Sequence, residues 1–286
     1  MVIRSQKLPA PGETILGGEF LMTAGGKGAN QAVAAAKLGG AVTFACKVGD
    51  DIFGGQAVQG FKDVGINTNF ITTDPINPSG VALILVDAKG ENSIAVAPGS
   101  NGNLLIADLE EVIEQIKEGD IVLIQLEIPI QTVNYAIQKC QGKGAKVILN
   151  PAPACMLDET IFQYIDTITP NETEAELLTG VKVTDQESAA KAAAILIDKG
   201  VSNVIITLGA KGAYHHNNLL QLLVPSPIVL AVDSTAAGDV FNGALALALT
   251  ESMDEETAVA FACKAAAISV TRMGAQASAP MRNEVI

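Results

Sequence analysis

Short apolar runs alternate with longer amphipathic stretches over most of the chain, from about residue 104 onward. The apolar runs cover 120–126, 145–150, 164–170 and 203–209. The stretches with helical character cover 130–142, 171–180, 186–199, 237–252 and 255–272. Strands that are apolar on both faces and alternate with helices are typical of a parallel sheet covered on both sides. We therefore predict an α/β fold with a mostly parallel central sheet flanked by helices.

Two segments, 13–26 and 79–99, break this alternation. The second predicts a β-hairpin that turns around residues 87–92. Both faces of its first strand are apolar, with Val81, Leu83 and Leu85 on one side and Ala82, Ile84 and Val86 on the other. A small exposed sheet of this kind needs a cover, which a partner subunit or a closing lid could supply. The alternative is that the hairpin belongs to the main sheet.

Composition and charge narrow the functional classes. Of 286 residues, 49% are hydrophobic and 17% charged, which allows a large core and excludes a disordered chain. The 31 acidic against 18 basic residues give a net charge of −13, which disfavours binding to nucleic acid or an anionic membrane. A phosphorylated ligand would therefore need backbone donors or a metal ion.

The cysteines indicate the compartment. Cys46, Cys140, Cys155 and Cys263 are widely spaced, with no CxxC pair, so neither a disulfide framework nor a zinc site is predicted. No apolar run of about 18 residues and no secretory signal pattern is present. We expect a soluble protein of the reducing cytoplasm.

The stretch "VDSTAAGDVFNGALALAL" (232–249) places a carboxylate, Asp239, where a helix is predicted to begin. The small residues before it leave backbone N–H groups uncovered, and such a helix start attracts anions. An acidic side chain at the same place repels an anion. The simpler interpretation is that Asp239 only caps or favours the helix N-terminus.

A glycine turn precedes another predicted helix in "AGGKGANQAVAAAKLG" (24–39). Lys27 and Asn30 offer a donor and a donor/acceptor pair that suit hydroxyl groups, and the glycines allow a ligand to approach closely. The alternative is an ordinary loop-to-helix junction. The segment matches neither a Walker A sequence nor a GxGxxG fingerprint, so a P-loop or Rossmann enzyme is not predicted.

Three further places have two interpretations each. In "TPNETEAELLTG" (169–180), Asn171 and Glu174 have capping-box spacing, or Glu174 steers the water shell of a magnesium ion. "TLGAKGA" (207–213) is a plain β-turn or a backbone cradle for a nucleotide. Glu127, at the carboxyl end of a strand, is a solvated strand end or part of a ligand site.

Six motifs in this order resemble those of the ribokinase-like, or PfkB, carbohydrate kinase family, from Met1 to about Met281. They are "GGKGANQA", "NPAPA" (150–154), "TPNETEAE", "TLGAKG", "DSTAAGDVFNGAL" and "VTRMGAQAS" (270–278). The resemblance implies a ribokinase-like fold with a small β-sheet lid. It divides the chain into a lid, 1–24 with 77–99, and an α/β nucleotide- and sugar-binding domain, 25–76 with 100–286.

The resemblance also implies roles for single residues. Asp239 is expected to be the general base, with the backbone N–H groups of Ala237, Gly238 and Asp239 as an anion hole and the helix dipole keeping Asp239 ionised. The expected sugar-binding residues are Gly26, Lys27, Gly28, Asn30, Glu127 and Asp239. The expected nucleotide-binding residues are Asn171, Thr207, Leu208, Gly209, Ala210, Lys211, Gly212, Gly238 and Cys263. Cys263 stands where relatives often carry a polar side chain.

Two ions follow from the same resemblance. Glu174 is expected to support Mg²⁺ through water. A monovalent-cation site, usually for potassium, is expected at Asp233, Thr235, Ser269, Arg272, Gly274 and Ser278.

The implied activity is ATP-dependent phosphorylation of a pentose, with D-ribose as the expected acceptor at its 5-hydroxyl, in a homodimer held by the lid. Alternatives are a kinase of another sugar or of a nucleoside, and a catalytically silent sugar- or nucleotide-binding protein. Relatives begin with a strand and an aspartate-bearing turn ahead of the position that matches Met1. We accordingly expect this chain to be less stable, and to bind sugar less well, than a version extended upstream.

Overall fold

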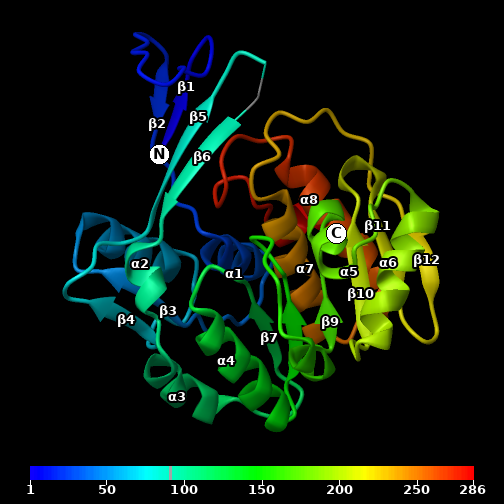
Figure 1. The fold of residues 1–286 in the computed structure, drawn as a ribbon. Helices are drawn as coiled ribbons and strands as arrows, with labels where there is room; N and C mark the ends of the chain where they lie inside the picture. Colours follow the sequence, from blue (N-terminus) through cyan, green and yellow to red (C-terminus); the bar gives the residue numbers. More distant parts are fainter. Residues whose placement is uncertain (90–91) are drawn as a thin grey trace.

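The computed structural model describes residues 1–89 and 92–286. Its main sheet has six strands in the order β12-β11-β10-β9-β8-β7 (Figure 1). These are β7 (Ile121–Ile124), β8 (Lys146–Leu149), β9 (Thr167–Ile168), β10 (Asn203–Thr207), β11 (Ala213–His216) and β12 (Gln221–Val224). Strands β7 to β10 are parallel, and β11 and β12 add an antiparallel edge. The predicted mostly parallel sheet is confirmed.

Helices cover both faces of this sheet, as the side chains of β10 show. Val204 and Ile206 lie in one core cluster with α3 (Ile106–Gln115), α4 (Ile130–Gly142), α5 (Glu172–Thr179) and α6 (Gln186–Asp198). Ile205, which points the other way, packs with α1 (Lys27–Lys37), α7 (Ala237–Thr250) and α8 (Glu255–Ser269). Alternate side chains of one strand are therefore buried on opposite sides, which explains its continuous apolar sequence.

Several of the predicted helices begin where a side chain accepts from a free backbone N–H group, whereas α4 and α7 have no such cap. Asp185 accepts from the N–H of Ser188 at the start of α6, and Asp254 accepts from Thr257 at the start of α8. All five predicted helical stretches are confirmed, although α8 ends at Ser269 rather than at 272.

A separate four-stranded sheet stands apart from the main body (Figure 1). Its order is β2-β1-β5-β6, with β1 (Val2–Arg4), β2 (Glu19–Leu21), β5 (Val81–Val86) and β6 (Asn92–Ala97). The hairpin of β5 and β6 is confirmed, and the alternative that it joins the main sheet is wrong. Two residues of the predicted turn, Gly90 and Glu91, lie outside the described residues. That this sheet acts as a lid stays a prediction.

A third unit was not predicted from the sequence. Strands β3 (Cys46–Gly49) and β4 (Ile71–Asp74) form a parallel pair connected through α2 (Ile52–Asp63). Short 3₁₀ turns, η1 (Gly99–Asn103), η2 (Glu159–Tyr164) and η3 (Gly209–Lys211), and a last helix, α9 (Arg282–Val285), complete the fold. Within the described ranges, no helix has both the length and the apolar character needed to cross a bilayer.

Candidate active site

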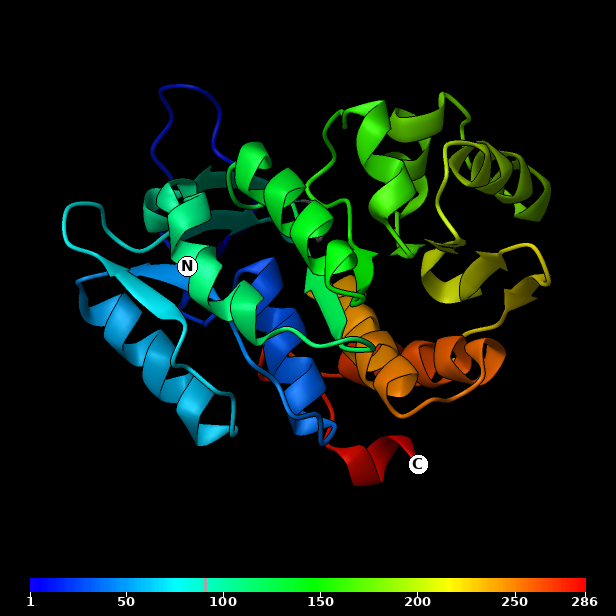
Figure 2. The same ribbon diagram turned by 90° about the horizontal axis from the view of Figure 1, so that it is seen from below.

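The candidate residues gather at the carboxyl edge of the main sheet, where open α/β sheets bind ligands. Glu127, Asn150 and Asn171 follow β7, β8 and β9, and Thr207 ends β10. Helices α1 and α7 lie side by side, and their N-terminal turns meet at this edge (Figure 2). Residues about 200 positions apart in the sequence are thereby in contact.

Asp239 lies in the first turn of α7 and does not cap the helix. The N-cap is Ala236, which has a left-handed backbone (φ 61°) and no side-chain hydrogen bond to the helix. Asp239 is 6% exposed, and its carboxylate faces α1 instead. Oδ2 accepts from Nδ2 of Asn30 at 2.8 Å, and Oδ1 accepts from Nε2 of Gln31 at 2.9 Å. Asp239 is therefore not the cap, although it is an acidic residue in the first turn of the helix.

Opposing effects act on the pKa of Asp239. Burial raises it, because a charged carboxylate loses hydration, whereas hydrogen bonds from Asn30 and Gln31 and the charge of Lys27 lower it. The net result is a pKa above the ordinary value. Loss of solvent therefore outweighs the groups that favour the charge. That the helix dipole keeps Asp239 ionised stays a prediction.

Free backbone donors lie beside this carboxylate. Among the described residues, the N–H groups of Gly238 and Asp239 have no acceptor, whereas the N–H of Ala237 donates to the carbonyl of Ser234 at 3.2 Å. The side chain of Asn242 donates to the carbonyl of Gly238 at 2.8 Å and so stabilises the first turn of α7. This geometry can receive an anion at Gly238 and Asp239.

The predicted sugar-binding residues lie together on the α1 side of Asp239. Gly26 has a φ of 92°, which only glycine adopts without strain, and a Cβ at Gly28 would lie 2.8 Å from Oε1 of Gln125. The N–H of Lys27 donates to Oε2 of Glu127 at 2.8 Å. Asn30 Oδ1 is buried and has no partner among the described residues, so one acceptor remains available for a ligand hydroxyl.

Glu174 serves the local structure and also faces the site. Its Oε2 accepts from the N–H of Asn171 at 2.9 Å, and Asn171 Oδ1 accepts from the N–H of Glu174 at 2.8 Å, so the capping box is confirmed. Glu174 is 7% exposed, and burial raises its pKa. The charge of Lys27 lowers that pKa and the charge of Asp239 raises it.

The expected nucleotide-binding turn follows β10. Thr207 pairs with Asn171 in a parallel bridge, and the N–H of Leu208 donates to the carbonyl of Gly212 at 2.8 Å across η3. A side chain at Gly212 would collide with the carbonyl of Val224, 2.0 Å from its Cβ. The turn of Gly209, Ala210 and Lys211 is exposed at the sheet edge.

Cys263, also expected at the nucleotide, is buried in the core. It is 4% exposed in the core cluster of α7 and α8, and burial raises the pKa of its thiol to about 11. Its side chain therefore offers almost no surface to a ligand.

The residues expected at the monovalent cation lie on two adjoining loops. Asp233 accepts from the N–H of Thr235 at 3.0 Å and from that of Gly274 at 2.9 Å. Partial burial raises the pKa of Asp233, but these hydrogen bonds outweigh it and keep the pKa below its ordinary value. The hydroxyls of Ser269 and Ser278 donate to carbonyls within their own turns.

The side chain of Arg272 turns away from these loops and pairs with Glu284. The structure thus brings Asp233, Thr235 and Gly274 together, and Arg272 could contribute only its backbone.

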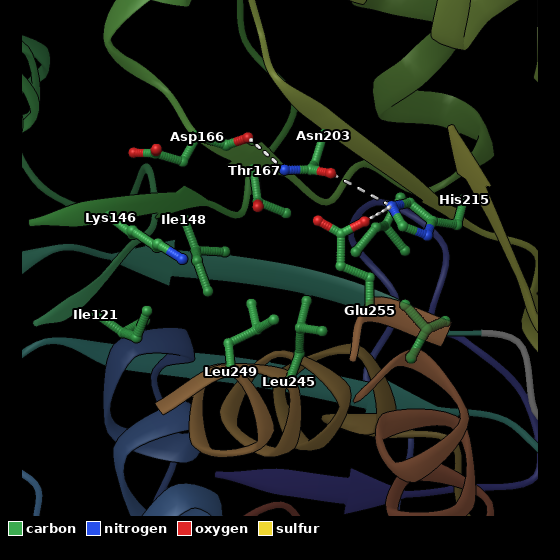
Figure 3. A pocket seen from close by; sticks show the side chains of 12 residues that line it. Ile121, Lys146, Ile148, Asp166, Thr167, Asn203, His215, Leu245, Leu249 and Glu255 are labelled. Atoms are coloured by element: carbon green, nitrogen blue, oxygen red, sulfur yellow. Dashed lines mark hydrogen bonds and ion pairs between the residues drawn. The ribbon is translucent and has the colours of Figure 1, made fainter. Parts of the chain in front are cut away.

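A hollow at the opposite edge of the sheet is separate from this site (Figure 3). It is a cavity of about 90 Å³, and its polar lining comes from Lys146, Asp166, Thr167, Asn203, His215 and Glu255. Lys146 and Asn203 are the first residues of β8 and β10, whereas the candidate site lies where these strands end. None of the predicted site residues lines it.

The fold and site together define a ribokinase-like α/β protein with a buried acid at a helix N-terminus that has free amides. The chain belongs to the pfkB family of carbohydrate kinases, whose profile matches residues 1–282. It is 46% identical over 276 residues to the ribokinase of Haemophilus influenzae, covering 96% of this chain and 90% of that one. It is 41% identical over 281 residues to the deoxyribokinase of Salmonella typhi, covering 98% and 92%.

Solved structures agree with this assignment. The crystal structure of a ribokinase from Thermotoga maritima superposes with a TM-score of 0.90 at 41% identity, covering 99% of this chain and 93% of that one. An Arabidopsis thaliana ribokinase complexed with ribose and ATP gives a TM-score of 0.92 at 31% identity, with the same coverage. The predicted ribokinase-like fold is confirmed.

Sequence reasoning missed the amides that surround the base. Gln31, Asn150 and Asn242 are all buried and hydrogen-bonded around Asp239 and Gly238. Their only sequence signal is position: each stands in or beside a motif already noted, "GGKGANQA", "NPAPA" or "DVFNGAL". Polar residues of the motifs that had no assigned ligand role were therefore the candidates for hydrogen bonds to the base.

Proposed function

We propose that this chain transfers the γ-phosphoryl group of ATP to the 5-hydroxyl of D-ribose. The observation that carries the proposal is Asp239, a buried carboxylate beside the free N–H groups of Gly238 and Asp239. Related proteins support the acceptor, because the ribokinases of Haemophilus influenzae and Bacillus subtilis are 46% and 41% identical to this chain.

In the proposed reaction, Asp239 takes the proton of the sugar hydroxyl while its oxygen attacks the γ-phosphorus. The bond to the bridging oxygen breaks, and ADP leaves with that oxygen. The amides of Gly238 and Asp239 stabilise charge on the transferred group. Such donors contribute about 3–4 kcal/mol each in the transition state, and a general base contributes about 10²- to 10⁴-fold in rate.

The sugar would lie between α1 and the loop after β7. Lys27, Asn30 and Glu127 would bind its hydroxyls, with Gly26 and Gly28 allowing the backbone to come close. The unpartnered Oδ1 of buried Asn30 supports this, because a ligand hydroxyl would satisfy it. The nucleotide would lie along Asn171 and the turn formed by Thr207, Leu208, Gly209, Ala210, Lys211 and Gly212.

ATP is used by kinases of this kind together with Mg²⁺, which would neutralise charge on the phosphates. Within residues 1–89 and 92–286, no cluster of three His, Cys, Asp or Glu side chains could hold a metal. The ion would therefore be held mainly by the phosphates and water. Glu174 fits this, because its second oxygen has no partner in the described chain and could accept from a metal-bound water.

A monovalent cation would bind at the loops of Asp233 and Gly274, with oxygens also from Thr235, Ser269, Arg272 and Ser278. Carboxylate and carbonyl oxygens suit potassium. The ion would stiffen the loop that leads into Gly238 without touching substrate. Replacing sodium with potassium should raise the rate of phosphoryl transfer. Asp233→Ala should reduce this response. Equal rates in both salts would contradict the cation site.

The functional unit would be a homodimer in the cytoplasm. The four-stranded sheet exposes large apolar side chains: Ile3, Phe20, Leu21, Met22, Leu83, Ile94 and Val96. A second copy could cover them while the sheet closes over the sugar, in keeping with the division into a lid (1–24 and 77–99) and an α/β domain (25–76 and 100–286).

Four unpaired cysteines support a reducing compartment.

An acceptor panel tests the proposal. ADP release is measured with D-ribose, 2-deoxy-D-ribose, fructose and a nucleoside, at fixed ATP and Mg²⁺. The highest kcat/KM is expected with D-ribose. 2-Deoxy-D-ribose is the essential competitor, because a deoxyribokinase is also 41% identical to this chain. A preference for another acceptor would change the substrate but retain the kinase; no acceptor-dependent ADP release would contradict both.

A further inference from the structure

A buried chain of amide side chains runs beneath the candidate base. Its central member is Gln31 on α1, which is 1% exposed. Nε2 of Gln31 donates to Oδ1 of Asp239 at 2.9 Å and to Oδ1 of Asn150 at 3.0 Å. Oε1 of Gln31 accepts from Nε2 of Gln125 at 2.5 Å. Every hydrogen-bonding group of the Gln31 side chain is therefore engaged within the protein.

Neighbouring groups on both sides of the Gln31 amide fix the direction of these hydrogen bonds. Nδ2 of Asn150 donates to the carbonyl of Thr169 at 3.2 Å, so its Oδ1 must face Gln31. On the other side, Gln125 presents a donor to the Gln31 oxygen. Rotating the Gln31 amide by half a turn would place oxygen against the Asp239 carboxylate and NH₂ against a donor. Only one orientation satisfies the network.

The same network reaches the proposed anion hole. The hydroxyl of Thr169 donates to Oδ1 of Asn242 at 2.6 Å, and Nδ2 of Asn242 donates to the carbonyl of Gly238 at 2.8 Å. Thr169 and Asn242 are each 1% exposed. The carboxylate of Asp239 and the backbone of Gly238 are thus tied to the ends of the same parallel strands, β8 and β9.

The two amides that contact Asp239 differ in whether they have a polar atom left for a ligand. Asn30 has a buried oxygen left over, which a ligand can use, whereas Gln31 has no free polar atom and almost no exposed surface. Asn30 and Gln31 each donate to a different carboxylate oxygen. Rotation of the carboxylate about its Cβ–Cγ bond would break both hydrogen bonds, so the pair fixes its plane.

We infer that Gln31 is a positioning residue for phosphoryl transfer, which holds the Asp239 carboxylate in its reactive orientation and as a hydrogen-bond acceptor without touching the substrate. The inference rests on the proposed function, since it assigns Asp239 the role of base. It extends the reaction machinery to a side chain that neither contacts a ligand nor carries a charge.

The variant Gln31→Met tests this, because methionine has a similar length but no donor. Loss of a hydrogen bond to a charged group corresponds to a fall in kcat of about 10- to 100-fold near neutral pH. The pKa of the base should rise, since its ionised form loses a donor. The acidic limb of the kcat profile should therefore move to higher pH, and alkaline pH should restore part of the rate. The KM for ribose should stay unchanged.

Thr132→Val is the matched control. Thr132 is 2% exposed on α4, and its hydroxyl donates to the carbonyl of Leu104 at 2.8 Å, away from the site. It should lower the melting temperature without moving the pH profile. If Gln31→Met does not fold, Gln31→Asn keeps a buried amide but is too short to join Asp239 and Asn150, and it should shift the profile in the same direction.

The outcomes separate the two proposals. A wild-type protein that phosphorylates no acceptor would contradict the proposed function itself. An active wild type together with a folded Gln31 variant whose pH profile matches the wild type would overturn the positioning role alone, even if kcat were reduced.

Discussion

At the scale of single residues, most polar groups of the candidate site are both buried and hydrogen-bonded. Asp239 is 6% exposed yet accepts two amide hydrogen bonds, and Gln31 is 1% exposed with all its groups paired. Asn30 breaks the pattern with one unpaired oxygen. Because an unpaired buried acceptor costs about 1–3 kcal/mol, that atom indicates where a ligand belongs.

His215 shows the cost of burial without adequate pairing. It is 1% exposed on β11, its Nδ1 has no partner among the described residues, and Nε2 lies 3.6 Å from Glu255. Burial lowers the pKa of His215 below its ordinary 6.5, with Glu255 opposing and His216 adding to the shift. The unfolded chain then binds the proton more readily, so stability is full above pH 6.5 and falls as the pH drops below it.

A comparison of the wild type with His215→Gln tests this pH dependence. The free energy of unfolding is measured by urea titration at pH 7.5 and 5.5. The free energy of unfolding of the wild type should fall relative to that of the variant at the lower pH, because glutamine does not titrate. An equal difference in the free energy of unfolding at both pH values would mean that His215 keeps its ordinary pKa in the folded protein.

At the scale of elements, the closeness of α1 and α7 decides whether the site exists. Gly243 on α7 faces the backbone of α1, and a Cβ there would lie 2.5 Å from the carbonyl oxygen of Gln31 and 2.9 Å from Cβ of Ala34. Only glycine allows the two helices to approach this far. The hydrogen bonds from Asn30 and Gln31 to Asp239 span the same interface.

Gly243→Ala should therefore damage stability and activity together. The added methyl must push α1 and α7 apart, at about 1–3 kcal/mol, and lengthen the hydrogen bonds to Asp239. Thermal unfolding and kcat are the measurements. Gly60→Ala on α2 is the control, because its Cβ meets nothing within 4 Å and helix propensity favours alanine by about 1 kcal/mol. A Gly243→Ala protein as stable and active as the wild type would show that the helices can separate freely.

The elements that the sequence predicted are those with strong local signals. Strands β7, β8 and β10 run through continuous apolar sequences, and alternate side chains of β10 are buried by helices on opposite faces. Strands β3 and β4 were missed because they mix polar with apolar residues, such as Lys47, Thr72 and Thr73. The amide network could not be predicted, because contacts such as Gln31 with Asn150 join residues 119 positions apart.

At the scale of the whole molecule, the four-stranded sheet remains without a cover. Phe20, Leu83 and Val96 are each more than half exposed on it. Large apolar surfaces of this kind usually mark an interface. A second copy of the chain is the proposed cover, since a symmetric dimer could bury the same sheet of both subunits.

Sedimentation velocity tests the dimer. The wild type should sediment as a dimer at micromolar concentration, and Phe20→Asp should shift it towards monomer, because an interface cannot readily bury the new charge. Leu219→Asp is the control: Leu219 is exposed at the turn between β11 and β12, outside the sheet, and its replacement should leave the dimer intact. A monomeric wild type would contradict the proposal.

In the proposed reaction, Asp239 removes the proton from the hydroxyl of ribose during transfer from ATP. The most direct measurement is ribose 5-phosphate formed by the wild type and by Asp239→Asn, together with ATP binding by both. The amide keeps the shape but takes up no proton, so product formation should fall by at least about 10²-fold while ATP still binds. Near-normal ribose 5-phosphate formation by Asp239→Asn would contradict the account.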